Sequence, residues 1–335
     1  MQLHEQFNMT PFRTGIGFCQ DNEGRDLVVA LLKATFHFAA NGPVAAATRD
    51  AGVPLFKKDV FHGEPATSSL RYATDVVPSK PGVDIAVVGH AYGRDLRSIE
   101  AGFALGACEK VLRVLGPRCW VGGRDSTIAG PVAFSKIPLL YEHAYGGCDT
   151  DSAGNKLVYD QNPVGVGFAT AARDKAPLPN LEYRNEALRS IKDRPRPAGF
   201  GFIPTGWKPR AQFAGTFDAA WEKSRRPLFP KDFDQRFHNA VPQDQVLGGD
   251  LKGGERVVLR NLNPRAVNVV FGLPPLHFVA IFRIKDRTEE LPMRADTVLI
   301  EPDQERFAIT FRSACTLGDD FRFLKSVTFR ETDRR

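Results

Sequence analysis

The amino-acid sequence predicts a mainly β protein, and three features of the chain support this class. Apolar and β-branched residues alternate with polar ones in several runs near both ends, amphipathic helices are scarce, and the middle of the chain is rich in proline and glycine. We therefore expect antiparallel sheets, arranged as a sandwich or as two β lobes. A long irregular segment rich in Pro, Gly and aromatic residues, with few short helices, should join them.

Three β regions are expected in the N-terminal part. Residues 27–39 are apolar and β-branched, as in a strand that is buried on one or both faces. Residues 83–93 form a second region after a proline-containing turn. In residues 99–120, two runs of alternating apolar and polar residues are separated by a short break. This pattern predicts a hairpin that turns near Glu109 and Lys110.

Beyond residue 122 the regular pattern fades, and it returns only near the C-terminus. Four glycines in the irregular part permit positive φ or close backbone approach, as turns require: Gly146, Gly147, Gly165 and Gly167. The C-terminal runs predict an antiparallel meander with one solvated face: 253–264, 276–284, 296–312 and 321–329. Pro302 and Asp303 predict a turn within the third run.

We call residues 193–245 the belt. Its seven prolines prevent any long hydrogen-bonded ladder, yet it carries nine Phe and Trp residues, more apolar surface than a solvated loop leaves in water. We expect an ordered irregular segment, with short helical turns near 219–223 and 232–239, whose rings pack on the sheets. Arginine–aspartate pairs and aspartate caps should satisfy its backbone, through a structural network of Arg194, Arg196, Asp218, Arg226, Asp232, Asp234, Arg236 and Asp244.

Composition limits the class of protein. Of the 335 residues, 42% are hydrophobic and 25% charged, as in globular proteins, and no apolar run approaches the roughly 20 residues that span a bilayer. The start of the chain lacks a signal-peptide pattern, so we expect a cytoplasmic protein without membrane contact. The five scattered cysteines suit buried thiols in a reducing compartment. A net charge of +6 without a basic block does not favour nucleic-acid binding.

Metal, phosphate and nucleophile motifs match poorly. Residues 149–155 (DTDSAGN) begin like a calcium loop, but Ala153 and Asp160 stand where ligands are needed, so an Asx-rich surface turn is the better interpretation. The pair His143 and Cys148 fits no zinc spacing. GxSxG, SxxK and GK[ST] phrases are missing from the sequence. We expect no metal and no cofactor.

One acidic cluster suggests an alternative enzymatic function. Asp232, Asp234 and His238, with Asp244 nearby, could serve a hydrolase or lyase if their environments separated their pKa values. The structural interpretation, which we favour, is that Asp232 caps the following turn while Asp234 and Asp244 pair with arginines such as Arg236.

Several phrases within residues 80–245 together resemble a bacterial family of unknown function that is encoded in type VI secretion gene clusters. They occur in the family's order and include KPGVDIAVVGHA, VLRVLGPRCW, IPLLYEHAYGG, NPVGVGF, LPNLE, DRPRPAGFGFIPTGWKPR, AGTFDAAW and PLFPKDFDQRFHNAVPQDQ. The resemblance implies one family domain over residues 1–335 and a non-enzymatic adaptor or chaperone. Such an adaptor loads a secreted effector onto the spike formed by the VgrG trimer and its PAAR cap. The resemblance implies no catalytic residues.

An adaptor needs an exposed surface for its protein partners. Trp, Arg and Phe are enriched where interfaces are anchored, so our candidates for exposed partner-binding residues are Trp207, Arg210, Phe217 and Trp221. Exposed tryptophans would also suit a carbohydrate-binding module, which is a weaker alternative. Three sub-lobes are possible: an N-terminal β lobe of residues 1–192, the belt, and a C-terminal meander of residues 246–335.

Overall fold

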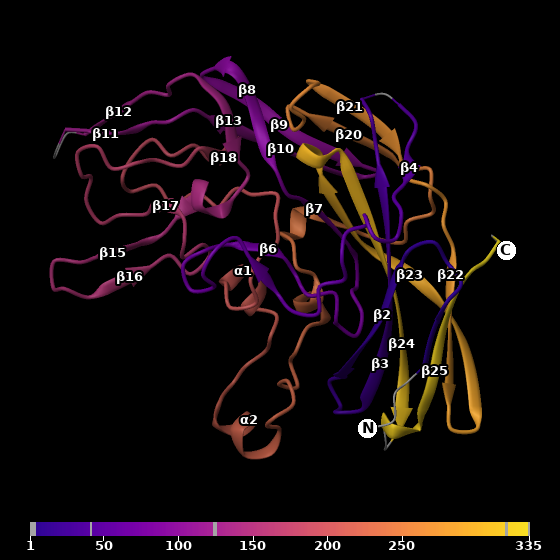
Figure 1. Ribbon diagram of the computed structural model, residues 1–335. Helices are drawn as coiled ribbons and strands as arrows, with labels where there is room; N and C mark the ends of the chain where they lie inside the picture. Colours follow the sequence, from indigo (N-terminus) through magenta and orange to yellow (C-terminus); the bar gives the residue numbers. More distant parts are fainter. Residues whose placement is uncertain (1–4, 41, 123–125, 319–320, 334–335) are drawn as a thin grey trace.

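The computed structural model describes residues 5–40, 42–122, 126–318 and 321–333 (Figure 1). The chain is 44% strand and 8% helical. Most strand pairs are antiparallel, and two sheets hold the longest strands. The predicted mainly β class with few short helices is confirmed.

The larger sheet contains strands from both ends of the chain. Its strands pair in the order β1 (Glu5–Asn8), β25 (Leu324–Glu331), β22 (Phe278–Ile284), β23 (Arg287–Glu301), β24 (Arg306–Gly318), β3 (Asp26–His37) and β2 (Arg13–Gln20). Three further strands branch from this path: β7 (Val83–Val87) beside β23, β19 (Val246–Leu247) beside β7, and β4 (Ala45–Ala46) beside β3. β1 runs parallel to β25, and β7 runs parallel to β23.

This sheet curls so that its outer strands β1 and β2 approach each other. They are consecutive in sequence, and the Gln6 Nε2 amide donates to Thr14 Oγ1 at 2.8 Å between them. The connection places Phe12 inside the curl, where its ring meets that of Phe278 edge to face at 5.9 Å. The curl therefore encloses an apolar interior between sequence-distant strands.

The apolar run at residues 27–39 explains why β3 lies in the middle of the sheet. Ten consecutive residues of β3 are buried, so the strand is covered on both faces, as the sequence predicts. Lys33 is the one cationic side chain in that run. Its ammonium group lies 2.6 Å from the Asp75 carboxylate, and this ion pair compensates the charge.

The second sheet has the order β18 (Leu181–Tyr183), β10 (Cys108–Leu115), β9 (Ser98–Leu105), β20 (Arg256–Arg260) and β21 (Asn268–Gly272). The hairpin of β9 and β10 is confirmed, but its predicted turn near Glu109 and Lys110 is wrong. The chain turns between Leu105 and Cys108, where Gly106 adopts a φ of 57°. Glycine accepts this conformation without the steric cost that other residues bear, so the turn falls there.

The remaining strands form short pairs: β5 (Val60–Phe61) with β6 (Leu70–Tyr72), β8 (His90–Leu96) with β13 (Phe134–Pro138), β11 (Cys119–Val121) with β12 (Thr127–Ala129), β14 (Tyr145–Gly146) with β17 (Val166–Gly167), and β15 (Cys148–Thr150) with β16 (Lys156–Val158). The β region predicted at 83–93 is thus divided between β7 and β8, which belong to different sheets. Gly146, Gly147 and Gly167 have positive φ, and Gly165 lies close to backbone, as expected of these turns.

The helices are all short. They are α1 (Lys208–Ala211), α2 (Ala219–Ser224), and the 3-10 turns η1 (Tyr141–His143), η2 (Gln235–His238), η3 (Gln243–Gln245), η4 (Pro302–Gln304) and η5 (Phe321–Phe323). The helical turns predicted near 219–223 and 232–239 and the turn at Pro302 are confirmed.

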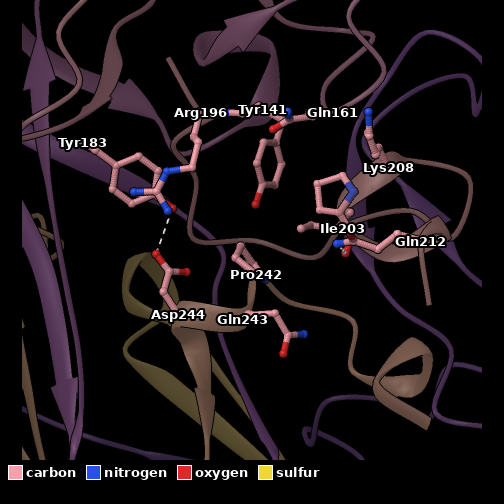
Figure 2. A pocket seen from close by; sticks show the side chains of 12 residues that line it. Tyr141, Gln161, Tyr183, Arg196, Ile203, Lys208, Gln212, Pro242, Gln243 and Asp244 are labelled. Atoms are coloured by element: carbon pink, nitrogen blue, oxygen red, sulfur yellow. Dashed lines mark hydrogen bonds between the residues drawn. The ribbon is translucent and has the colours of Figure 1, made fainter. Parts of the chain in front are cut away.

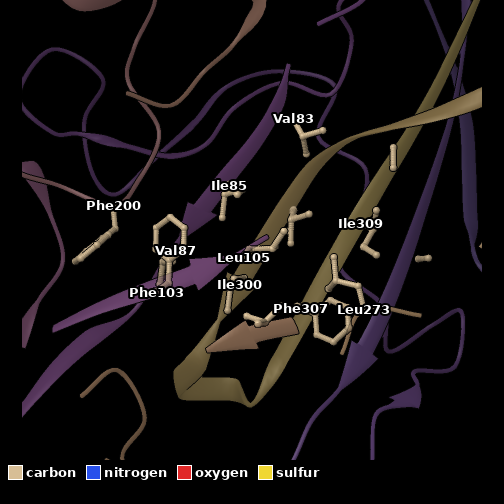
Figure 3. Packing of buried hydrophobic residues seen from close by; sticks show 14 of the residues in the cluster. Val83, Ile85, Val87, Phe103, Leu105, Phe200, Leu273, Ile300, Phe307 and Ile309 are labelled. Carbon is tan, nitrogen blue, oxygen red and sulfur yellow. The ribbon is translucent and has the colours of Figure 1, made fainter. Parts of the chain in front are cut away.

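The two strand-rich ends share sheets and one main core. In the larger sheet β3 lies between β2 and β24, and in the second sheet β9 pairs with β20. Residues 1–192 and 246–335 are therefore intermixed, rather than forming two spatially separate lobes. Figure 3 shows the resulting core, in which Ile85 of β7, Phe103 of β9 and Phe307 of β24 belong to one cluster of buried side chains.

The belt contributes directly to this core. Phe200 is fully buried, and its ring meets Phe103 at 6.0 Å. The two ends of the belt also bond to each other and to β7, because the Ile203 N–H donates to the Ala240 carbonyl at 2.7 Å and Gln245 Nε2 donates to the Ile85 carbonyl at 2.7 Å. The belt is consequently an ordered structural segment, as predicted.

Candidate partner-binding surface

Between its two anchored ends, the belt forms an arm of residues 213–232 that carries α2 and stands out below α1 in Figure 1. α2 starts after Asp218, whose carboxylate accepts the Trp221 N–H at 2.8 Å. An aspartate at this position satisfies a donor that lacks a partner at a helix start. The phrase FDAAW therefore explains locally why a helix forms here.

The arm displays an aromatic pair. Phe217 is 54% exposed, and its ring meets that of Trp221 edge to face at 4.8 Å. The Trp221 indole N–H donates to the Leu228 carbonyl at 2.8 Å, which fixes the ring across the arm. Phe217 thus projects its ring from a preorganised support.

The arm is tied to the turn between β2 and β3. Arg225 donates to the Asn22 carbonyl and lies 3.2 Å from a Glu23 carboxylate oxygen. Leu228 packs over Gly24, where a Cβ atom would lie 3.0 Å from the leucine side chain. These contacts join the end of α2 and the residues after it to the turn between two strands of the larger sheet.

Where the chain leaves the arm, an aromatic cluster forms from Phe229, Phe233 and Phe237. Their ring centroids lie 4.3 to 5.7 Å apart. His238 follows them and is buried against Phe233. Aromatic contacts of this kind stabilise a segment that lacks regular secondary structure.

Two of the four residues predicted to be exposed are buried, and that prediction is wrong for them. Trp207 is 8% exposed and packs edge to face on Tyr141 at 5.5 Å, within the main core. Arg210 is 5% exposed and donates to the carbonyls of Phe237 and Ile203, at 2.8 and 3.0 Å. The irregular belt leaves backbone acceptors without ladder partners, and the guanidinium group satisfies two of them.

Most residues of the predicted arginine–aspartate network have partners other than the ones predicted. Asp234 pairs with Arg236, whose Nε lies 2.8 Å from Oδ2, as expected. Arg226 approaches Glu222 at 3.7 Å instead of an aspartate. Asp232 accepts from the Thr216 N–H and hydroxyl, so it holds the chain before α2 and does not cap the turn after it.

The outer members of the predicted network have partners outside the belt or on the backbone. Arg196 pairs with Glu186, with 2.7 Å from Nε to Oε1. Asp244, which was expected to meet an arginine, instead lies 2.9 Å from Lys110 Nζ. Arg194 donates to the carbonyls of Ile191 and Asp193. The belt thus depends more on side-chain-to-backbone bonds than on aspartate–arginine pairs.

The acidic cluster of the enzymatic alternative is not brought together as a unit. No hydrogen bond or ion pair joins any two of Asp232, Asp234 and His238. Hydrogen bonds from Arg236 lower the pKa of Asp234, and hydrogen bonds from Thr216 lower that of Asp232. Burial, followed by the nearby charge of Arg210, lowers the pKa of His238 to about 4, so its imidazole is neutral.

The residues considered for metal binding have other partners. In the hairpin of β15 and β16, Asp151 accepts the N–H groups of Ala153 and Asn155 as an Asx turn, and Asp149 accepts from Thr170. His143 Nδ1 lies 2.9 Å from Asn180 Oδ1. Over residues 5–40, 42–122, 126–318 and 321–333, no three His, Cys, Asp or Glu side chains are placed to hold a metal ion.

A pocket of about 350 Å³ opens where the two ends of the belt meet (Figure 2). Residues 196–212 and 242–244 form most of its wall, and Tyr141, Gln161 and Tyr183 from outside the belt complete it. Burial raises the pKa of Tyr141 well above its usual value, so the hydroxyl stays protonated. Sequence reasoning missed this pocket, because its walls come from separate segments with no shared motif.

The fold and this surface define a mainly β scaffold whose irregular belt presents an aromatic arm and a small pocket. The chain belongs to a bacterial family described as an uncharacterized protein conserved in bacteria (DUF2169), whose model matches residues 23–312. This confirms the expected membership of a bacterial family of unknown function. No curated protein and no solved structure matches the chain. Within the described residues, none of the helices has the length and apolar character to cross a membrane.

Proposed function

We propose that this protein is a non-enzymatic adaptor that binds a protein partner through its arm. The observation that carries the proposal is the half-exposed Phe217 ring held on Trp221 and anchored through Arg225 to the larger sheet. Burying the rest of an exposed aromatic side chain contributes on the order of 1–2 kcal/mol, and a rigid support lowers the entropy cost of binding.

The surroundings of Phe217 have the composition of an interface. Ala219 and Ala220 are small and exposed beside it, while Glu222, Lys223 and Arg226 are exposed around the helix. An apolar centre with a rim of mixed charges is the common anatomy of protein interfaces. The rim charges favour a partner with its own mixture of acidic and basic groups, rather than a polyanion.

The resemblance of residues 80–245 to type VI secretion adaptors supports a more specific role. In that role the partner is a secreted effector, which the protein holds in the cytoplasm and releases when the effector joins the VgrG–PAAR spike. Binding energy concentrated in one aromatic anchor suits a complex that must later dissociate.

The proposal is tested by co-purification of the effector encoded by the neighbouring gene. Phe217→Ser should weaken this complex roughly 30-fold, because removing a central aromatic anchor costs about 2 kcal/mol or more. The matched control is Phe7→Ser, which alters a similarly exposed phenylalanine on β1 and should leave affinity unchanged. Failure of the wild-type protein to bind the effector, with unchanged effector abundance in a deletion strain, would contradict the proposal.

A further inference from the structure

The pocket between the belt ends contains a buried hydroxyl without a hydrogen-bond partner in the described part of the chain. Tyr141 is 3% exposed, and no described residue forms a hydrogen bond with its hydroxyl oxygen. Figure 2 shows the hydroxyl directed into the pocket, above Pro242. An unsatisfied buried polar group costs about 1–3 kcal/mol, so an acceptor supplied by a ligand in the pocket would relieve this cost.

The packing of Tyr141 holds this hydroxyl in place. Its ring meets Trp207 edge to face at 5.5 Å, and it also lies against Gly199, where a Cβ atom would come within 2.6 Å of the ring. A side chain on residue 199 would displace the tyrosine. The donor is therefore preorganised by the core and the belt, and its raised pKa keeps the proton on the oxygen.

The charged groups that line the pocket already have partners. Arg196 pairs with Glu186, and Lys208 Nζ lies 3.3 Å from Asp160. Asp244 accepts from Tyr183 at 2.8 Å as well as pairing with Lys110. A charged ligand would meet no unpaired opposite charge, and it would lose hydration on entering. The electrostatics consequently favour an uncharged ligand.

The remaining lining groups match a peptide backbone. Among the described residues, none forms a hydrogen bond with the side-chain amide of Gln161 or Gln243, and each amide offers both a donor and an acceptor. Pro197, Pro209 and Pro242 supply apolar wall. Proline-rich segments in the polyproline II conformation carry unbonded carbonyls and apolar rings, and they dock in grooves lined by aromatic side chains, which Tyr141 and Tyr183 supply here.

We propose that this pocket binds an uncharged, proline-containing extended segment of the protein partner, with a backbone carbonyl accepting the hydrogen bond of Tyr141. The inference rests on the adaptor function proposed above. A volume of about 350 Å³ lies at the lower end of the range for ligand pockets, so only a short part of the segment enters. Within the belt, the arm follows α1 directly and ends before η2, so one partner can contact both the arm and the pocket.

The test begins with selection of random octapeptides by display against the immobilised full-length protein. The expected result is enrichment of uncharged peptides with proline, and a synthetic peptide made from the selected sequence should bind in calorimetry. Tyr141→Phe should weaken its binding roughly 2- to 12-fold, the loss expected for one neutral hydrogen bond. Gln212→Trp, which fills the pocket from an exposed position on its wall, should abolish binding.

A matched control separates binding from folding. Tyr159→Phe removes a hydroxyl bonded to the Pro195 carbonyl outside the pocket lining, so peptide affinity should be unchanged. Tyr141→Phe should leave the thermal midpoint equal or higher, because it deletes an unpartnered hydroxyl, whereas a purely structural role would lower it.

Three results would overturn the pocket proposal: no enrichment beyond that of the Gln212→Trp protein, enriched peptides with an obligatory charge, or unchanged affinity in both pocket variants. The adaptor proposal fails separately, in the co-purification experiment. If Phe217→Ser lowers effector binding while Tyr141→Phe and Gln212→Trp leave it unchanged, the arm is the interface and the pocket is not part of it.

Discussion

Replacing Asp84 by asparagine should loosen the contact between β7 and belt residues Asn239 and Ala240. Asp84 is fully buried in β7, and its Oδ2 accepts from Lys80 Nζ at 2.6 Å and from the Ala240 N–H at 2.9 Å. Its Oδ1 accepts from Asn239 Nδ2 at 2.7 Å. One carboxylate thus joins a buried ammonium group to two consecutive belt residues.

The magnitude follows from what the substitution leaves behind. Lys80 is almost completely buried, and Thr297 Oγ1 at 2.8 Å is its other hydrogen-bond partner. Removing one member of a buried ion pair costs about 3–5 kcal/mol, because the other charge stays desolvated without compensation. We therefore expect Asp84→Asn to lower the free energy of unfolding by about 4 kcal/mol.

The assay is urea unfolding followed by tryptophan fluorescence, since two of the three tryptophans, Trp207 and Trp221, lie in the belt. Lys80→Met and the double variant complete a cycle in which the double variant should lose less than the sum of the single losses. Glu290→Gln is the matched control, because its ion pair with Arg330 at 2.8 Å is half-exposed and should contribute less than about 1 kcal/mol. An Asp84→Asn loss no larger than that of Glu290→Gln would refute the anchoring role.

Three further predictions concern protonation, thiol reactivity and backbone strain. The His238 pKa of about 4 lies below the unfolded value of 6.5, so the unfolded chain binds a proton first as the pH falls; this group should lower stability by roughly 3 kcal/mol from pH 6.5 to pH 4, and urea unfolding should find the loss smaller by that amount in His238→Gln. At pH 8 iodoacetamide should label the exposed Cys148 long before Cys108, whose pKa burial raises to about 11; equal rates by peptide mass spectrometry would contradict this. Gly147→Ala should cost about 1–3 kcal/mol in thermal unfolding, because φ is 105° and a Cβ atom would lie 2.5 Å from a carbonyl oxygen, whereas Gly201→Ala has open space and should cost less.

The strands were predictable where the signal is local. The largely apolar run of β3 indicates a strand buried on both faces, and the alternation in β22 follows from the two-residue period of a strand; both signals are written in the sequence itself. The parallel pairing of β7 with β23 is not local, because it joins residues far apart in the chain. Nothing in either strand alone specifies that partner.

The candidate surface also has one feature that the local sequence predicts and one that depends on distant contacts. Asp218 caps α2 through a contact three residues away, so the phrase FDAAW predicts its own helix. Trp207 and Phe217 are both aromatic residues near prolines and charges, and one is buried while the other is exposed. Their difference arises because Trp207 packs on the buried ring of Tyr141 within the main core, whereas Phe217 lies on the arm and packs on Trp221 outside that core.

The sequence by itself determined that this protein is mainly β, that its longest strands lie towards both ends, and that a proline-broken aromatic belt between them is ordered. These properties follow from residue type and short-range periodicity, which act over a few neighbours. Only the tertiary structure decided that both ends share their sheets, which rings and guanidinium groups are buried, and that distant segments enclose a pocket around Tyr141. Those outcomes depend on contacts between residues far apart in sequence, whose free energy exists only when the chain is folded.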